Sequence, residues 1–428
     1  MALPAQQSAP PARRRLGATV IALAVVSLLT DVSSDMIYPL LPGFLAGTLG
    51  VSAAFLGVIE GAAETTAALL KLASGWWSDR LRRRKPLVVA GYGLSALVRP
   101  LVALATGGGQ VLAIRVADRV GKGLRSSPRD ALIADAVDPR DRGRAYGAHR
   151  AADNAGAVLG PLIAFALLGV GGVSLRTVFA LAAIPGLMAV VVVAARVREA
   201  ARTTPAPTLV VRREEGALAV APAAVVEEVA SGRSTGHAPE PFGPAFRTVM
   251  VAILVFTLGN STDAFLLLRA TTVGVPVAQV PLLWALYNGV KALASMPGGA
   301  LSDRIGRRPV VLAGWLLYAG TYVGFAFATH PWHVWALFAV YGLTFGLTEG
   351  TEKALVADLT PTARRGTAFG WYNLVVGVGA LPASVLFGVL WTRYGPTTAF
   401  ITGGAFALVG TLVLTLARLP SRPAHGAH

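Results

Sequence analysis

Ionisable residues interrupt the apolar segments of this sequence, and the interruptions mark where chemistry could take place. The most heavily charged stretch is 111–136, which carries Arg115, Asp118, Arg119, Lys122 and Arg125. At about 100° per residue these side chains fall on one face of a helix. A charge near the centre of a bilayer costs about 2.5–3.5 kcal/mol, so such residues usually face a cavity and have partners. We therefore expect a membrane-crossing helix whose charges face a water-filled path.

Acidic side chains in the other apolar segments are candidates for carrying a proton. A carboxylate in a dehydrated cavity near a second carboxylate can hold a proton close to neutral pH. A carboxylate beside Arg or Lys instead stays ionised and acts as a structural pair. Both roles stay open for each acid at this point. The candidates for proton coupling are Asp31, Asp35, Glu60, Glu64 and Asp263.

The cations of 111–136 are the main sequence clue to a substrate. Arginine presents a planar fork that suits carboxylate or phosphate, whereas lysine is a point charge. A row of them favours an anionic or zwitterionic substrate. The alternative is that they only neutralise the acids of the first two segments, and the sequence leaves both open. The candidates for the substrate cavity are Arg115, Asp118, Arg119, Lys122, Arg125, Asn260, Lys291, Glu349 and Glu352.

The bulk composition is typical of a protein that lies mostly within a membrane. Of its 428 residues, 54% are hydrophobic and 14% are charged, whereas soluble domains are about 25% charged. The pattern predicts an all-α polytopic membrane protein with twelve transmembrane helices. The expected segments are 17–45, 52–77, 86–105, 111–136, 145–169, 175–195, 247–270, 279–301, 309–329, 333–357, 367–392 and 397–417.

Short basic clusters predict the orientation of the chain. Clusters at 13–15, 80–85, 140–144, 304–308 and 364–365 alternate with nearly neutral connections. Because basic loops stay on the cytoplasmic side, both termini are expected there, in a multi-pass protein of the cell inner (plasma) membrane. The same parity requires 111–136 to cross the membrane. The net charge of +16 lies mostly in these loops, which argues against a nucleic-acid partner.

Two halves of the sequence repeat each other. Residues 73–91 align with 297–314 after one inserted residue, and 131–147 align with 354–370 without a gap. We therefore expect two pseudo-symmetric six-helix bundles, 1–196 and 246–428, with a substrate site between them near the midplane. Residues 197–245 are polar and rich in Pro and Ala, as in a cytoplasmic linker, and a short helix over 217–230 is one option within it.

The repeated segments carry motifs that resemble the major facilitator superfamily. Its loop signature, G-x-x-x-D-R-x-G-R-R, occurs in part in the first half, as Gly75, Asp79 and Arg80. The second half has a complete copy, made of Gly299, Asp303, Arg304, Gly306, Arg307 and Arg308. The resemblance implies that the two aspartates interact with helix ends across the seam between the halves, in one access state only. These loops are the expected gate.

A second motif resembles the fifth helix of the antiporter branch of that superfamily. Its residues here are Gly147, Gly156, Gly160 and Pro161, and the competing explanation is close packing of small residues. A third signature, R-x-x-Q-G in the fourth helix, is matched only at Arg115.

Taken together, the resemblance and the charges lead us to expect a proton-coupled secondary active transporter that works by alternating access. The main hypothesis is an antiporter that exports a small molecule, either a drug or a metabolite. Anionic and zwitterionic molecules are among the expected substrates. The alternative is a proton-coupled uptake symporter or exchanger of a small organic anion. There is no Walker sequence, so we expect an ion gradient rather than ATP to drive transport. The sequence has no Cys, no His-rich metal set and no nucleophile–base arrangement, so we expect no enzyme activity, no metal and no cofactor. The expected partners are the substrate, protons and the lipid bilayer, with the protein acting as a monomer.

Overall fold

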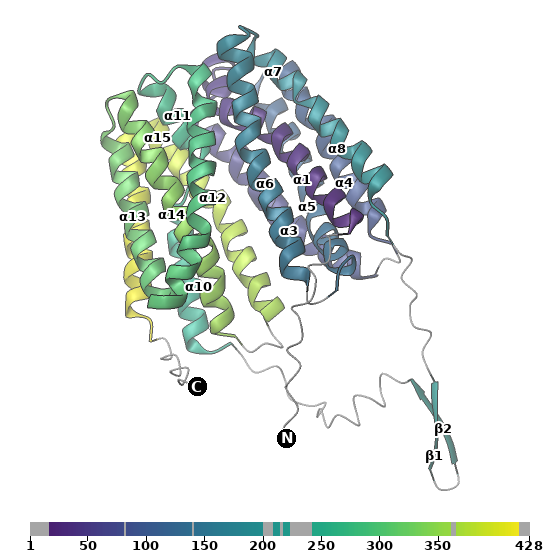
Figure 1. The fold of residues 1–428 in the computed structure, drawn as a ribbon. Helices are drawn as coiled ribbons and strands as arrows, with labels where there is room; N and C mark the ends of the chain where they lie inside the picture. Colours follow the sequence, from purple (N-terminus) through teal and green to yellow (C-terminus); the bar gives the residue numbers. More distant parts are fainter. Residues whose placement is uncertain are drawn as a thin grey trace, which may run out of the picture.

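The computed structural model describes residues 17–80, 83–138, 141–199, 209–214, 217–222, 242–360 and 365–418. The predicted fold class is confirmed, because the described residues outside a short strand pair at 209–222 form an all-helical polytopic bundle of two halves. In Figure 1 the purple-to-blue helices of the first half stand beside the green-to-yellow helices of the second.

Six membrane crossings make up the first half. Three of them end in 3₁₀ or π-helical turns, and the sixth is built from two helices with one residue between them. In chain order the elements are α1 (Ala18–Ile37) with η1 (Tyr38–Leu40), α2 (Leu41–Gly43) and η2 (Phe44–Thr48); α3 (Ala53–Arg80); α4 (Lys85–Val98) with η3 (Arg99–Leu104); α5 (Gly108–Asp135); α6 (Arg142–Phe165) with η5 (Ala166–Val170); and α7 (Leu175–Leu181) with α8 (Ala183–Arg196).

The second half also makes six crossings. The elements are α10 (Pro244–Gly259) with α11 (Ala264–Thr272), η6 (Val277–Gln279), α12 (Val280–Ile305), α13 (Arg307–Phe327), α14 (Pro331–Asp358) and α15 (Arg365–Leu416). The long α15 contains the last two crossings, which bend sharply at Gly395, where φ is +86°. Residues with a Cβ atom rarely adopt a positive φ, so glycine at this position allows the chain to turn back.

Within the described part of the chain, eight helical stretches are long and apolar enough to cross a membrane by length and composition alone. The charged α5 is not among them, and neither are α12 and α14. These helices have 28, 26 and 28 residues, about 40 Å at 1.5 Å per residue, enough to span the hydrocarbon core. They are spanning helices that a hydropathy window misses, as predicted for 111–136.

The linker prediction is tested only in part. Most of 197–245 lies outside the described residues, so the expected boundaries of the two halves stay a prediction. Within it, β1 (Leu209–Glu214) and β2 (Ala217–Pro222) form an antiparallel pair with Leu209 opposite Pro222. The described part of 217–230 is therefore a strand rather than the optional helix.

The halves meet along two seams, formed by α3 with α15 and by α6 with α12. Figure 1 shows α6 and α12 side by side. We call the end of the bundle where α8 ends and α10 begins the linker end. At the opposite end, the backbone N–H of Ala54 donates to Thr392 Oγ1 at 3.0 Å. Further along, Thr65 Oγ1 donates to the Gly377 carbonyl at 2.8 Å.

The α3–α15 seam opens toward the linker end. Leu72 and Trp76 continue the helical face of α3 that carries Thr65, yet they are 57% and 63% exposed. Asn373, one turn before Gly377 on α15, is exposed as well. We call this region, with Leu72, Trp76 and Asn373, the open seam. The halves are therefore closed at one end and separated at the other.

Candidate functional site

Arg115 and Glu60 form a buried ion pair between α5 and α3. The guanidinium donates to both carboxylate oxygens, at 2.9 Å from Nε and 2.5 Å from Nη2. The two side chains are 9% and 1% exposed. The same guanidinium lies 5.5 Å from the centre of the Tyr38 ring. This fork geometry is the strong form of a charge-assisted hydrogen bond, so both charges are satisfied by each other.

One helical turn further toward the linker end, Arg119 pairs with Glu64. Their charged atoms are 2.9 Å apart, and the Glu64 side chain is 44% exposed. Glu60 and Glu64 are thus aligned on one face of α3, opposite Arg115 and Arg119 on α5. The sequence left open whether the α5 cations bind substrate or only neutralise nearby acids. Arg115 and Arg119 neutralise Glu60 and Glu64.

Two further charges of α5, Asp118 and Arg125, face α4 instead of α3. Asp118 accepts from Arg99 at 2.8 Å, with both side chains under 10% exposed. Arg125 donates to Ser95 Oγ at 2.7 Å and stacks over the Tyr92 ring at 4.6 Å. The expectation that all charges of this helix face one path is therefore wrong, because its charged arc is wide enough to face two neighbouring helices.

Lys122 differs from the other α5 cations. Its side chain is exposed, and it makes no salt bridge to any residue that the structure describes. Its ammonium is close enough to interact with Asp31 and Glu64 electrostatically. Of the expected substrate-binding cations on α5, Lys122 is the one that solvent reaches freely.

Three of the predicted coupling acids have no cation within 4 Å among the described residues. Asp35 accepts a hydrogen bond of 3.0 Å from the indole N–H of Trp284, which belongs to the other half. Asp263 accepts one of 2.5 Å from the Tyr341 hydroxyl. Asp31 lies one turn before Asp35 on α1. Glu60 and Glu64, by contrast, are paired with arginines, so the five acids fall into two classes.

Tyrosine and tryptophan side chains dominate the centre of the second half. Tyr38 of the first half packs on Trp284 with ring centres 5.0 Å apart, and Trp284 continues to Tyr287 at 4.8 Å. Tyr287 then contacts Tyr341 at 5.2 Å, and Tyr341 contacts Phe345 at 4.9 Å. This aromatic row runs from the seam between the halves into the second half.

The seventh crossing is interrupted beside this aromatic row. Helix α10 ends at Gly259 and α11 begins at Ala264, with Asp263 at the N-terminal cap of α11. Asn260 Oδ1 accepts from the Tyr318 hydroxyl at 3.1 Å. Broken helices in transporters leave backbone groups and helix ends available at a binding site. Asn260 and Asp263 occupy that position here.

The other substrate candidates of the second half lie closer to its linker end. Glu349 pairs with Lys291 at 2.8 Å and with Lys353 at 3.2 Å. Glu352 instead accepts hydrogen bonds from Trp315 and Tyr372, at 2.8 and 3.1 Å, and no described cation lies within 4 Å of it.

The glycines of the antiporter-like helix pack α6 tightly against α1. A Cβ atom at Gly156 would lie 2.6 Å from the Leu28 carbonyl oxygen, and one at Gly160 would lie 2.6 Å from that of Val32. Gly147 has open space around it, and Pro161 lies within the helix. Close packing therefore accounts for Gly156 and Gly160, and it brings α6 against the turn that carries Asp31.

His149 and Asp153 were not among the predicted site residues, although they lie on the same helix. His149 is 4% exposed, and neither ring nitrogen has a hydrogen-bond partner among the described residues. Its Nε2 lies 3.8 Å from Asp153 Oδ1, and Asp153 accepts from Ser27 of α1. The sequence signal was the spacing of four residues between two ionisable groups in an apolar segment.

Of the two loops expected to form the gate, the one between α12 and α13 in the second half has its side chains described by the structure. Gly306 has φ of +97° between α12 and α13, which explains the glycine of the complete signature. Asp303 pairs with Arg307, which also approaches Asp358 at 3.6 Å. Asp303 is 64% exposed, so its carboxylate faces solvent while the linker end is open. The side chains of Asp79 and Arg80 lie outside the described residues.

Three comparisons bear on the family. The model of the Major Facilitator Superfamily matches residues 23–268 and 248–428. An uncharacterized MFS-type transporter of Methanocaldococcus jannaschii is 30% identical over 407 residues, which is 94% of this chain and 95% of that protein. The class C tetracycline resistance protein of Escherichia coli is 38% identical over 112 residues, 26% of this chain and 27% of that protein.

Among solved structures, that of the nucleoside transporter NupG superposes with a TM-score of 0.73, covering 94% of this chain and all of that one at 12% identity. At that identity the likeness concerns the fold. Together with the family match over both halves, it shows that the chain belongs to the major facilitator superfamily of secondary transporters.

Proposed function

We propose that this transporter is a proton-coupled antiporter that exports a small anionic or zwitterionic molecule by alternating access, as a monomer in the inner membrane with its linker end toward the cytoplasm. The observation that carries the proposal is the contact between Asp35 and Trp284. It joins a carboxylate of one half to a hydrogen-bond donor of the other, and no described cation neutralises it.

This contact can couple proton binding to movement of the halves. An ionised carboxylate accepts a stronger hydrogen bond than a protonated one. Asp35 is half-buried, and a carboxylate withdrawn from water without an adjacent cation is costly to keep charged. Proton exchange at Asp35 therefore changes the strength of a bond between the halves and shifts the equilibrium between access states. Asp31 shares this proton, and Asp263 is the corresponding acid of the second half.

A route for the proton leads along the packed face between α1 and α6. Asp153 stands between His149 and Ser27, and Asp31 interacts with both Asp153 and Asp35 electrostatically. These groups form a series from the linker end toward Trp284. We expect His149→Gln to slow transport driven by a pH gradient about a hundredfold, at the low end for a lost proton-transfer group. Exchange of substrate in the absence of a gradient should be unchanged, and equal slowing of both would exclude this route.

The substrate is proposed to enter through the open seam and to reach Lys122. The free ammonium attracts a negative group, and the aromatic row from Tyr38 to Tyr341 offers flat surfaces for the rest of the molecule. The fifth-helix motif and the local similarity to a tetracycline resistance protein favour export over uptake.

The test is transport in proteoliposomes with an imposed pH gradient. An antiporter accumulates substrate inside vesicles with an acidic interior, whereas a symporter accumulates it when the exterior is acidic. A panel of organic anions, zwitterions and cations would identify the substrate class. Asp35→Asn keeps an acceptor for Trp284 but cannot exchange a proton, so gradient-driven accumulation should be lost while exchange persists. Full gradient-driven accumulation by this variant would contradict the proposal.

The alternative function is uptake of an organic anion with a proton. The exposed Lys122 supports it as well as it supports export, because a free cation attracts an anion from whichever side the site faces. Accumulation with an acidic exterior, abolished by Asp35→Asn, would establish this alternative and exclude the antiporter.

A further inference from the structure

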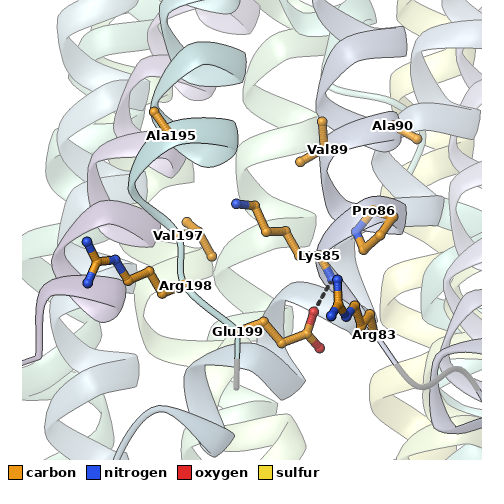
Figure 2. A pocket seen from close by; sticks show the side chains of 9 residues that line it. All are labelled: Arg83, Lys85, Pro86, Val89, Ala90, Ala195, Val197, Arg198 and Glu199. Carbon is orange, nitrogen blue, oxygen red and sulfur yellow. Dashed lines mark hydrogen bonds between the residues drawn. The ribbon is translucent and has the colours of Figure 1, made fainter. Parts of the chain in front are cut away.

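A second hollow lies outside the transport path, at the linker end between α4 and α8. It has a volume of about 770 Å³. Its walls come from the first turns of α4, the last turn of α8 and the three residues that follow α8 (Figure 2). The two helices pack directly against each other, so the hollow is the widened end of a groove between neighbouring crossings.

Three cations line this hollow. Arg83 and Arg198 are exposed and lie on opposite sides of it, while Lys85 extends from α4 toward α8 (Figure 2). The Lys85 ammonium donates to the Ala194 carbonyl at 2.7 Å, which holds it in place. Neither Arg83 nor Arg198 makes a salt bridge within the described part of the chain.

The single acid of the hollow is already engaged. The carboxylate of Glu199 accepts from the backbone N–H groups of Arg84 and Lys85, at 2.7 and 2.8 Å. It therefore caps the N-terminus of α4, where a negative charge is stabilised. The cations are left to face an external partner, and the local excess of positive charge is two.

The apolar part of the hollow continues into surfaces that face lipid. Ala90 of α4 lies on the same helical stripe as Leu97, which is 66% exposed. On α8, Ala195 shares a stripe with Val191, which is 65% exposed, and with Met188 and Ile184. Exposed aliphatic side chains along a membrane-spanning helix contact acyl chains. The hollow thus joins a cationic rim to two apolar stripes.

We propose that this hollow binds the headgroup of an anionic phospholipid. Its phosphate lies between Arg83, Lys85 and Arg198, and its acyl chains follow the groove between α4 and α8. Basic pockets between crossings at a membrane surface recognise such headgroups. A soluble phosphate would gain nothing from the apolar stripes, and a zwitterionic lipid carries no net charge to match the rim. The site is independent of the proposed coupling at Asp35.

The experiment measures lipid bound to the purified full-length protein by native mass spectrometry, with phosphatidylglycerol against phosphatidylcholine as probes. The test variant is Arg83→Gln with Arg198→Gln, which leaves the Lys85 and Glu199 contacts intact. The matched control is Arg142→Gln with Arg247→Gln, two exposed arginines in first turns at the same end. At about 1 kcal/mol for each basic residue near a membrane surface, the test variant should bind phosphatidylglycerol about thirtyfold more weakly. The control should bind as the unaltered protein does.

A second variant, Ala195→Phe, keeps every charge but fills the apolar side of the hollow, and it should also weaken phosphatidylglycerol binding. Loss in the test variant and in Ala195→Phe, but not in the control, supports the site. Equal loss in test and control variants would mean attraction to the basic end in general and would overturn it. Absence of a preference for phosphatidylglycerol, or its full displacement by inorganic phosphate, would overturn it as well.

Discussion

The two halves use the same helical positions for different chemistry. In the first half, α3 and α5 face each other through the arginine–glutamate pairs Arg115–Glu60 and Arg119–Glu64. In the second half, the centre of the equivalent surface between α12 and α14 carries aromatic rings, with Tyr287 against Tyr341, and its ion pair, Lys291–Glu349, lies nearer the linker end. One half holds its centre together by paired charges, and the other does so by packed rings and hydroxyl hydrogen bonds.

This difference separates two requirements of a transporter. Paired charges fix geometry but bind protons poorly, because an adjacent arginine keeps a carboxylate ionised. Acids held by neutral donors, as Asp35 and Asp263 are, can gain or lose a proton. We therefore propose that the arginine pairs act as the rigid frame of the first half and that proton coupling belongs to acids that this frame leaves unpaired.

The largest expected effect comes from breaking one arginine pair. Arg115→Met leaves the Glu60 carboxylate buried without a partner, and such a loss costs about 3–5 kcal/mol of stability. The matched change in the second half is Lys291→Met, because Glu349 keeps Lys353 and is partly exposed. That change should cost less than about 1 kcal/mol. Unfolding in detergent, followed by tryptophan fluorescence, measures both.

A double variant tests the cause of the loss. Arg115→Met with Glu60→Gln removes both charges, so most of the stability should return because no buried charge is left unpaired. If the double variant is as unstable as Arg115→Met alone, the loss comes from packing around Arg115, and the frame does not depend on charge.

Much of this fold could be predicted from the sequence. Loop charges and the internal repeat identified α5 as a crossing, although its hydropathy does not. The basic loops at 80–85 and 140–144 lie on the same side of the membrane, so the chain must cross it twice between them. The turn at Gly395 falls in the gap predicted between 367–392 and 397–417, where the Gly-Pro pair is a strong local turn signal. The interruption after Gly259 lies inside the predicted segment 247–270 and was missed, because it depends on a few backbone angles that tertiary packing selects.

The candidate site was predictable in composition but less so in arrangement. Sequence spacing placed Asp118 and Arg125 on the same arc as Arg115, and helical geometry supports that. Which neighbour each one contacts depends on where α3 and α4 lie around α5, and spacing along one helix does not contain this information. The contact between Asp35 and Trp284 was out of reach for the same reason, since it joins residues of different halves.

A smaller effect is expected from the free cation of the first half. Lys122→Gln removes an exposed ammonium that makes no salt bridge to a described residue, so stability should change little. If Lys122 attracts the substrate, KM for an anionic substrate should rise about tenfold, the equivalent of 1.4 kcal/mol. Lys353→Gln removes a paired lysine of the second half and should leave KM nearly unchanged. Equal effects of the two would mean that the second half also contributes to charge recognition.

The last expected effect depends on protonation and comes from a hydroxyl of the aromatic half. Tyr341→Phe keeps the ring contacts with Tyr287 and Phe345 and removes the hydrogen bond to Asp263. The expected loss of stability is about 1–3 kcal/mol if Asp263 is ionised, because a bond to a charged group is then lost, and about 1 kcal/mol or less if it is protonated. Comparing Tyr341→Phe in the wild-type and Asp263→Asn backgrounds isolates the part of this bond that depends on the charge of Asp263, because asparagine still accepts a hydrogen bond from Tyr341. A small interaction energy between the two substitutions at neutral pH would mean that Asp263 already carries a proton. The second half would then share the proton-coupling role that we propose for Asp35 of the first half.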